Sequence, residues 1–289
     1  METLQNNELK ILIDEKGAEL KSVVHLGHQL EYMWSGDPAY WAKTSPVLFP
    51  IVGALKENTY FFEGKSYHLS RHGFAREKTF TVVEKDEQSI TLSLSSDNET
   101  LAVFPFAFEF SVTYRLEENR LTVSYRVQNE EKKQIYFSVG AHPAFKLPLV
   151  GGTSYDDYSL QFEKAETAGR WPISKEGLIE TAPTPFLQNE NRLPLTKALF
   201  QKDAIVLKHL QSGFVRLVSD KTPHGLQFRI EGFPYLGLWA APNADFLCIE
   251  PWCGIADSVD TNQNLPDKEG ILALPAAEQF QVAWLAVFF

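Results

Sequence analysis

Three side chains in this sequence stand in contexts that suit them to proton transfer. Glu250 follows the apolar run 246–249 and precedes a proline and a tryptophan, His72 lies in an Arg-His-Gly-Phe-Ala-Arg turn, and His142 lies in a Gly-Ala-His-Pro-Ala-Phe loop. An ionised carboxylate buried without a partner is unfavourable, so a glutamate at the end of a buried strand is usually paired, hydrogen-bonded or used to move protons. These residue types predict general acid/base chemistry. The structural alternatives are a salt-bridged strand end and two histidines satisfied by backbone groups.

The remaining histidines and the two cysteines indicate no metal or redox centre. His68 and His72 are four residues apart, but the residues between them are typical of a strand and a turn and not of a helix, so we predict no metal site. Cys248 and Cys253 have a spacing that fits no common zinc site, and we expect reduced thiols. Four other histidines are expected to be solvated turn or strand-end residues: His25, His28, His209 and His224. No cofactor is implied.

The elements that must position these residues are strands. Runs with alternating or β-rich apolar character are separated by polar turn clusters, which is typical of antiparallel hairpins. The runs are 9–13, 20–26, 80–83, 90–94, 108–116, 121–127, 135–139, 158–162, 204–207, 214–218, 226–230, 236–239, 246–249 and 280–287.

Helical periodicity is nearly absent from the sequence. Short helical turns are predicted only at 38–43, 99–104 and 195–200. Without helices between the strands a parallel sheet is excluded, so the sequence predicts an all-β sandwich of large antiparallel twisted sheets in a single domain, 1–289. The segment 164–195 carries four prolines and is expected to be irregular, either as the border of a binding site or as a surface excursion.

Composition excludes several classes of partner. The chain has 289 residues, 44% hydrophobic, and a net charge of -10. A nucleic acid or an anionic membrane demands a basic surface, so neither partner is expected. The N-terminal residues lack the basic and apolar pattern of a secretory signal, and no apolar segment approaches the roughly 20 residues that span a bilayer. We therefore expect a cytoplasmic protein.

Four segments in order along the chain carry a family resemblance. They are Pro-Val-Leu-Phe-Pro at 46–50, His-Gly-Phe-Ala-Arg at 72–76, Gly-Ala-His-Pro-Ala-Phe at 140–145 and Cys-Ile-Glu-Pro-Trp at 248–252. They resemble the aldose 1-epimerase (galactose mutarotase) family, and most closely its bacterial LacX-like subgroup, with similarity from about residue 9 to the C-terminus.

The resemblance implies a galactose mutarotase-like β-sandwich with a sugar cleft on one sheet. By similarity Glu250 would be the general base and His142 the general acid. His72 would position the substrate, and Asp203 would bind a sugar hydroxyl. The partner would be a small-molecule sugar.

One position departs from the subgroup. The subgroup usually has an arginine after a Val-Gly pair, and this chain has Ala54 there. Lys43, Arg71 and Arg76 are the nearest candidates to supply the missing positive charge, with Arg76 favoured because it lies in the His72 turn. Their structural alternative is to be surface cations.

The chemistry of anomer exchange fits these residue types. Opening a hemiacetal ring removes a proton from the C1 hydroxyl and adds one to the ring oxygen. Reference pKa values of about 4.3 for Glu and 6.5 for His predict an ionised Glu250 beside a protonated His142. Trp252 is our choice for the aromatic wall of the cleft. Other aromatic candidates are expected to be mostly core: Trp34, Trp41, Trp239, Phe74 and Phe145.

Three functional classes remain open from the sequence. The first is an aldose 1-epimerase acting on a hexose or on a hexose phosphate. The second is a glycosidase, which needs two carboxylates and for which Asp257 is the second candidate. The third is a carbohydrate-binding protein without catalysis.

Overall fold

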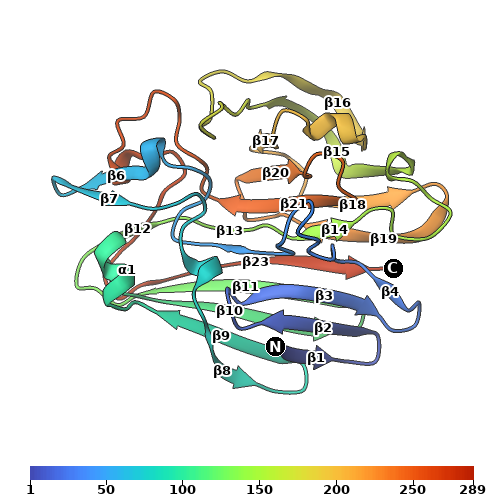
Figure 1. Cartoon of the computed structure of the whole chain (residues 1–289), viewed down its shortest axis with the longest axis horizontal. Coiled ribbons are helices and arrows are strands. Elements are labelled where there is room, and N and C mark those ends of the chain that lie inside the picture. The colour runs from blue at the N-terminus through green and yellow to red at the C-terminus, as the bar shows by residue number, and fades with distance from the viewer.

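Two large antiparallel sheets form the framework of the computed structural model, which describes all 289 residues (Figure 1). Nine strands form one sheet in the order β16-β15-β18-β19-β23-β11-β10-β9-β8. Their bounds are β8 Thr81–Lys85, β9 Ser89–Ser95, β10 Phe108–Glu117, β11 Arg120–Asn129, β15 Tyr158–Arg170, β16 Thr184–Pro194, β18 Phe214–Ser219, β19 Thr222–Arg229 and β23 Gln279–Phe288. Burial alternates residue by residue along β11, which turns one face of this sheet to the core.

A shorter sheet carries the segments singled out in the sequence. It runs in the order β17-β20-β21-β13-β5, with β14 also paired to β21. Its strands are β5 Val47–Leu48, β13 Val139–Ala141, β14 Ala144–Lys146, β17 Ile205–Lys208, β20 Tyr235–Trp239 and β21 Phe246–Cys253. All eight residues of β21 are buried, as expected of a central strand covered on both faces.

Smaller elements complete the molecule. A four-stranded sheet contains β1 Glu2–Gln5, β2 Leu9–Asp14, β3 Glu19–His25 and β4 Leu30–Glu31, and two strand pairs join β6 Thr59–Phe62 to β7 Lys65–His68 and β12 Ile135–Phe137 to β22 Leu272–Leu274. The one α-helix is α1 Asn98–Val103, and the short 3-10 helices are η1 Lys56–Asn58, η2 Ala75–Glu77, η3 Tyr155–Asp157, η4 Lys197–Phe200 and η5 Leu265–Asp267. No helix in the structure has the length and apolar character needed to cross a membrane.

The apolar core is continuous through the chain. One cluster of buried side chains reaches from Leu4 to Phe288. A second, small cluster includes Trp252 and Val206 and belongs to the shorter sheet. The all-β prediction is confirmed, and α1 and η4 fall within one or two residues of predicted helical turns. The third predicted turn, 38–43, contains no helix but begins with a hydrogen-bonded turn, in which the Tyr40 and Trp41 N–H groups donate to the Asp37 carbonyl oxygen.

Two sequence-based expectations about elements are wrong. The segment 164–195 is not irregular throughout, because β15 continues to Arg170 and β16 pairs with it from Thr184 to Pro194. Most residues of β16 are exposed, so this edge strand has no apolar alternation to mark it. Glu250 does not end a strand either, since β21 continues to Cys253.

Candidate functional site

A cleft of about 600 Å³ on the shorter sheet gathers most of the residues singled out in the sequence. Its wall includes Glu250, His142, His72, Arg71, Arg76, Asp203 and Trp252, together with Trp41, Trp239, Gly53, Ala54, Ile173, Ser174, Lys175, Gly177, Ile179, Phe200, Gln201, Lys202, Ala204, Val206, Pro242 and Ala256. A larger cavity of about 790 Å³ elsewhere contains none of the predicted acid/base residues. The chemistry therefore points to the first cleft.

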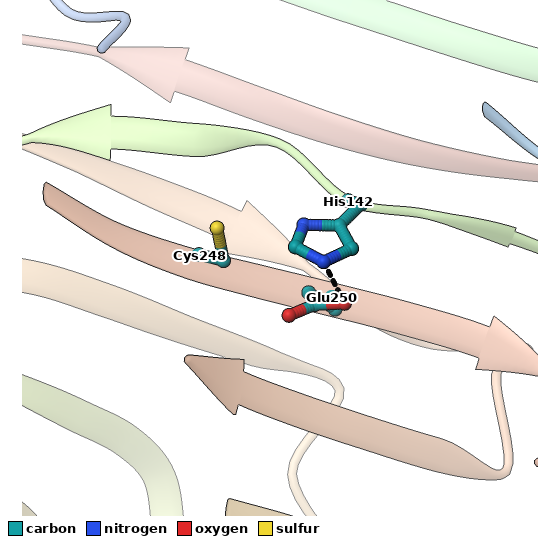
Figure 2. A group of neighbouring side chains, drawn as sticks. All are labelled: His142, Cys248 and Glu250. Carbon is teal, nitrogen blue, oxygen red and sulfur yellow. Dashed lines mark ion pairs between the residues drawn. The ribbon is translucent and has the colours of Figure 1, made fainter. Parts of the chain in front are cut away.

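Strand register places His142 opposite Glu250. On one side of the histidine Gly140 pairs with Trp252, and on the other Ala144 pairs with Cys248. Continuing either pairing inward brings His142 across from Glu250, where the ladder is interrupted between β13 and β14. Opposite residues of antiparallel strands project from the same face. The two side chains accordingly meet, with His142 Nε2 3.2 Å from Glu250 Oε2 (Figure 2).

Burial determines the charge state of this pair. The side chains of His142 and Glu250 are 11% and 2% exposed. Burial lowers the pKa of His142 to about 3, with a smaller contribution from the Arg76 guanidinium. Burial, and then repulsion from the Asp203 carboxylate, raises the pKa of Glu250 well above its usual value. The prediction of an ionised Glu250 beside a protonated His142 is therefore wrong for the free protein, because the low-polarity surroundings favour both neutral forms.

Aromatic rings fix the orientation of His142. Its ring centroid lies 4.9 Å from Trp41, 5.7 Å from Trp239 and 5.7 Å from His72. Its Nδ1 atom is buried without a hydrogen-bond partner in the protein, and Glu250 Oε2 has no partner beyond its 3.2 Å contact with His142 Nε2. Buried polar atoms of this kind are costly unless a ligand or water satisfies them.

His72 is held by its backbone and by Gly53. The Gly53 N–H donates to His72 Nδ1 at 3.1 Å, which leaves the proton of the neutral ring on Nε2. His72 has φ 68°, a left-handed conformation that is uncommon outside glycine and is often found at functional sites. A side chain at the next residue, Gly73, would place Cβ 2.3 Å from the Phe49 carbonyl oxygen, so only glycine fits there.

The pKa of His72 predicts an acid-sensitive fold. Burial, and then His142, Arg76 and Arg71, holds this pKa well below 6.5. As the pH falls below 6.5, the unfolded chain gains a proton at this ring that the folded chain does not, so stability is lost. When the pH falls from 7 to 5, the wild type is expected to lose about 1–2 kcal/mol more of its unfolding free energy than His72→Gln loses. Urea unfolding at both pH values measures it. The exposed His68→Gln control should follow the wild type, and equal losses in all three proteins would contradict the assignment.

Two glycines allow Trp252 to lie in the cleft. A Cβ at Gly237 would lie 2.5 Å from ring atoms of Trp252, and one at Gly140 would lie 2.7 Å from another. The indole therefore crosses the backbones of both neighbouring strands. Its Nε1–H is buried, and its interaction with the Glu250 carboxylate partly offsets the rise in the pKa of Glu250 that burial causes.

Filling the space beside this ring should displace it. Gly237→Ala is expected to cost about 1–3 kcal/mol of unfolding free energy by overpacking and to change the tryptophan fluorescence of the folded protein. Chemical unfolding followed by fluorescence measures both effects. Gly151→Ala is the matched control, since its Cβ would meet no atom within 4 Å. Identical behaviour of the two variants would contradict the packing described for Trp252.

The predicted polar residues divide into those on the cleft and one that lies elsewhere. Arg71, Arg76 and Asp203 line the cleft. Asp203 has φ 95°, and its Oδ1 accepts a hydrogen bond from the Ala204 N–H at 2.7 Å. Lys43 is not among the lining residues, and its Nζ forms an ion pair with Glu77 at 3.0 Å.

The second carboxylate proposed for a glycosidase is engaged elsewhere. Asp257 Oδ1 forms an ion pair with Lys268 Nζ at 2.9 Å, and both side chains are almost completely buried. Asp257 Oδ2 accepts a hydrogen bond from the Lys56 N–H. Asp257 does not line the cleft with Glu250. Its role is structural, which removes the residue on which the glycosidase hypothesis depended.

Cys248 lies beside His142 and Glu250. Donor atoms of His142, Cys248 and Glu250 all lie within 4.8 Å of one another (Figure 2), so these three residues are the group that could hold a metal ion. Burial, and then the Glu250 carboxylate, raises the pKa of the Cys248 thiol well above its usual value. The protonated thiol is a poor metal ligand. Both cysteines are free and buried.

Sequence reasoning missed part of the cleft wall. Ile173, Ser174, Lys175, Gly177 and Ile179 come from the connection between β15 and β16, and Gln201 and Lys202 come from the turn after η4. The proline-rich composition of the first segment gave one signal, since such segments often border a binding site. Lys175 and Lys202 are single lysines in loops, and nothing in the sequence indicated that they line the cleft.

Comparisons with known proteins agree with this architecture. A family model described as aldose 1-epimerase matches residues 2–266. The chromosomal LacX protein of Lactococcus lactis subsp. lactis is 37% identical over 277 residues, covering 92% of this chain and 91% of LacX.

Solved structures of two bacterial proteins superpose closely. A galactose mutarotase related enzyme from Lactobacillus acidophilus is 34% identical with a TM-score of 0.94, covering 100% of this chain and 97% of that one. A galactose mutarotase-like protein from Lactobacillus casei is 33% identical with a TM-score of 0.94 and full coverage of both chains.

Proposed function

Because this chain belongs to the aldose 1-epimerase family, we propose that it catalyses the exchange of α and β anomers of an aldose. The observation that carries the proposal is the buried contact of 3.2 Å between His142 Nε2 and Glu250 Oε2 in a cleft that can hold a sugar. A pocket of several hundred Å³ with few convergent polar groups is typical of small-molecule sites.

The reaction requires one base and one acid, and the pair supplies both. Glu250 takes the proton from the C1 hydroxyl, and His142 gives a proton to the ring oxygen as the C1–O5 bond opens. The free aldehyde then rotates about the C1–C2 bond and closes on its other face, returning both protons. The sugar gains and loses no proton overall.

The raised and lowered pKa values are consistent with these roles. Glu250 and His142 share one titratable proton. Whichever of the two residues carries this proton is the donor, and the other residue is the acceptor. Sugar hydroxyls that donate to Glu250 stabilise its ionised form, and moving its proton to His142 then prepares the base and the acid together. Each positioned group contributes about 10² to 10⁴ in rate.

The remaining wall of the cleft suits a sugar. Trp41, Trp239 and Trp252 offer apolar ring surfaces to the C–H face of a pyranose. Asp203 and Gln201 offer groups that bind hydroxyls. His72, with its proton on Nε2, offers a fixed donor.

Anomer exchange with purified protein tests the proposal. One anomer of glucose or galactose is dissolved freshly and followed by polarimetry, and NMR exchange spectroscopy extends the assay to 6-phosphates. We expect exchange well above the buffer rate for at least one sugar. Rates equal to buffer for every sugar would overturn the proposal. Sugar binding without exchange would identify a non-catalytic carbohydrate-binding protein instead.

A further inference from the structure

Four cations line the cleft, and none of them forms an ion pair. Arg71, Arg76, Lys175 and Lys202 all belong to the wall. None takes part in an ion pair, whereas most other basic side chains of this acidic protein do. The only acidic side chains of the wall are Asp203 and Glu250, and burial favours the neutral form of Glu250. The cleft is therefore locally positive in a chain of net charge -10.

The two arginines lie close together. Arg76 Nη2 donates to the Arg71 carbonyl oxygen at 2.9 Å, and Arg76 Nε is buried without a partner. The adjacent carboxylate, Glu77, is shared between Lys16 and Lys43. Burial lowers the pKa of Arg76, with a smaller contribution from repulsion by the Arg71 guanidinium, and a buried N–H without an acceptor is unfavourable. A bound anion would relieve both costs.

The position of the Arg71 guanidinium depends on a glycine. A Cβ built on Gly177 would lie 1.9 Å from Arg71 Nη2 and 3.4 Å from Ala54 Cβ. The guanidinium thus lies across the Gly177 backbone, next to Ala54. Arg71 therefore brings a cation to the part of the cleft wall beside Ala54.

We propose that Arg71 and Arg76 form an anion subsite, and that the substrate is an aldose carrying a phosphate on the end of the sugar remote from C1. This inference rests on the proposed anomer exchange and specifies its substrate class. Guanidinium groups bind phosphate oxygens in a paired, directional manner. Lys175 and Lys202 are exposed and add attraction at the mouth of the cleft.

Kinetics with matched substrates test the subsite. We expect kcat/KM for glucose 6-phosphate or galactose 6-phosphate to exceed that for the neutral sugar by about 10-fold or more, as one or two charge-assisted hydrogen bonds predict. Arg71→Ala should reduce that preference by about 10- to 100-fold, mainly through KM. Lys65→Ala, which removes an exposed and unpaired cation outside the cleft, is the control and should keep the preference. The KM for the phosphorylated sugar should also rise with ionic strength.

Gly177→Ala tests whether the position of the Arg71 guanidinium matters as well as its charge. It keeps the arginine but moves the guanidinium and strains the loop backbone, where Gly177 has φ 85°, so the preference for the phosphorylated sugar should fall as it does in Arg71→Ala. Equal kcat/KM for neutral and phosphorylated sugars, unaffected by Arg71→Ala, would overturn the subsite and leave anomer exchange standing. Preference for a hexuronate over the 6-phosphate would also overturn the assignment of a phosphate.

Binding without turnover distinguishes the two proposals. Calorimetric titration of Glu250→Gln with galactose 6-phosphate should show binding that Arg71→Ala weakens. Such binding in a protein that exchanges no sugar, even as wild type, would support the subsite while refuting the epimerase function. Absence of binding to the phosphorylated sugar in both the wild type and Glu250→Gln would refute the subsite.

Discussion

Glu250→Gln is expected to slow anomer exchange by about 10² to 10⁴-fold, because the amide cannot accept the proton of the C1 hydroxyl. The variant should fold normally. Burial already favours the uncharged carboxyl group, and glutamine has nearly the same shape. Stopped-flow polarimetry or NMR exchange measures the rate, and urea unfolding at neutral pH measures the stability.

The pH dependence of stability gives this variant a second signature. The folded-state pKa of Glu250 is raised, so wild-type stability falls as the pH rises above 4.5 through the raised pKa. Glu250→Gln should lose this slope. The signature is independent of any substrate.

A matched control separates chemistry from burial. Glu166 is also almost completely buried, but it accepts hydrogen bonds from the Gln211 and Ser212 N–H groups outside the cleft. Glu166→Gln should leave the exchange rate unchanged even if it lowers stability.

His142→Asn should slow anomer exchange about as much as Glu250→Gln does. The double variant should be little slower than either single variant, because the two residues are expected to act as a unit. Exchange within about threefold of wild type in Glu250→Gln would exclude it as the base.

Lys268→Met is expected to lower the free energy of unfolding by about 3–5 kcal/mol, because it leaves the Asp257 carboxylate buried without its partner. Lys268 Nζ lies 2.9 Å from Asp257 Oδ1 and also donates to the Ile255 carbonyl oxygen at 2.6 Å. The two side chains are 3% and 2% exposed. Urea unfolding at pH 7 measures the change.

Removing both charges should recover much of this loss. In the double variant Asp257→Asn with Lys268→Met no charge is buried, and the amide oxygen of Asn still accepts a hydrogen bond from the backbone. Lys197→Met is the control for a surface pair, since Lys197 and Asp245 are 37% and 58% exposed, and its cost should stay below about 1 kcal/mol. A loss in Lys268→Met no larger than in Lys197→Met would contradict the structural role of this pair.

The fold was predictable because most strands carry a local signal. Alternation along β11 or the apolar run that begins β21 reflects burial directly, and local periodicity reports burial well. The exposed edge strand β16 carries no such pattern and was missed. The end of β21 was also misplaced, because the charged Glu250 interrupts the apolar run while the strand continues.

The candidate site was predictable in its residue types but not in its charges. Glu250 and His142 stand out by their neighbours in sequence, whereas their register depends on long-range pairing of β21 with β13 and β14. The protonation of the pair depends on desolvation by the folded protein, which no local pattern reports. Lys175 and Lys202 reach the cleft from loops, where a single lysine usually indicates only solvent exposure.

Strand β21 is hydrogen-bonded to β20 on one side and to β13 and β14 on the other. The backbone that carries Glu250 therefore cannot shift without breaking pairing on both sides. The cations come instead from three separate connections that contain Arg71 and Arg76, Lys175, and Lys202. Under the proposed function, exchanging these connections one at a time would change which sugar is accepted and would leave Glu250 and His142, the proposed proton-transfer pair, in place.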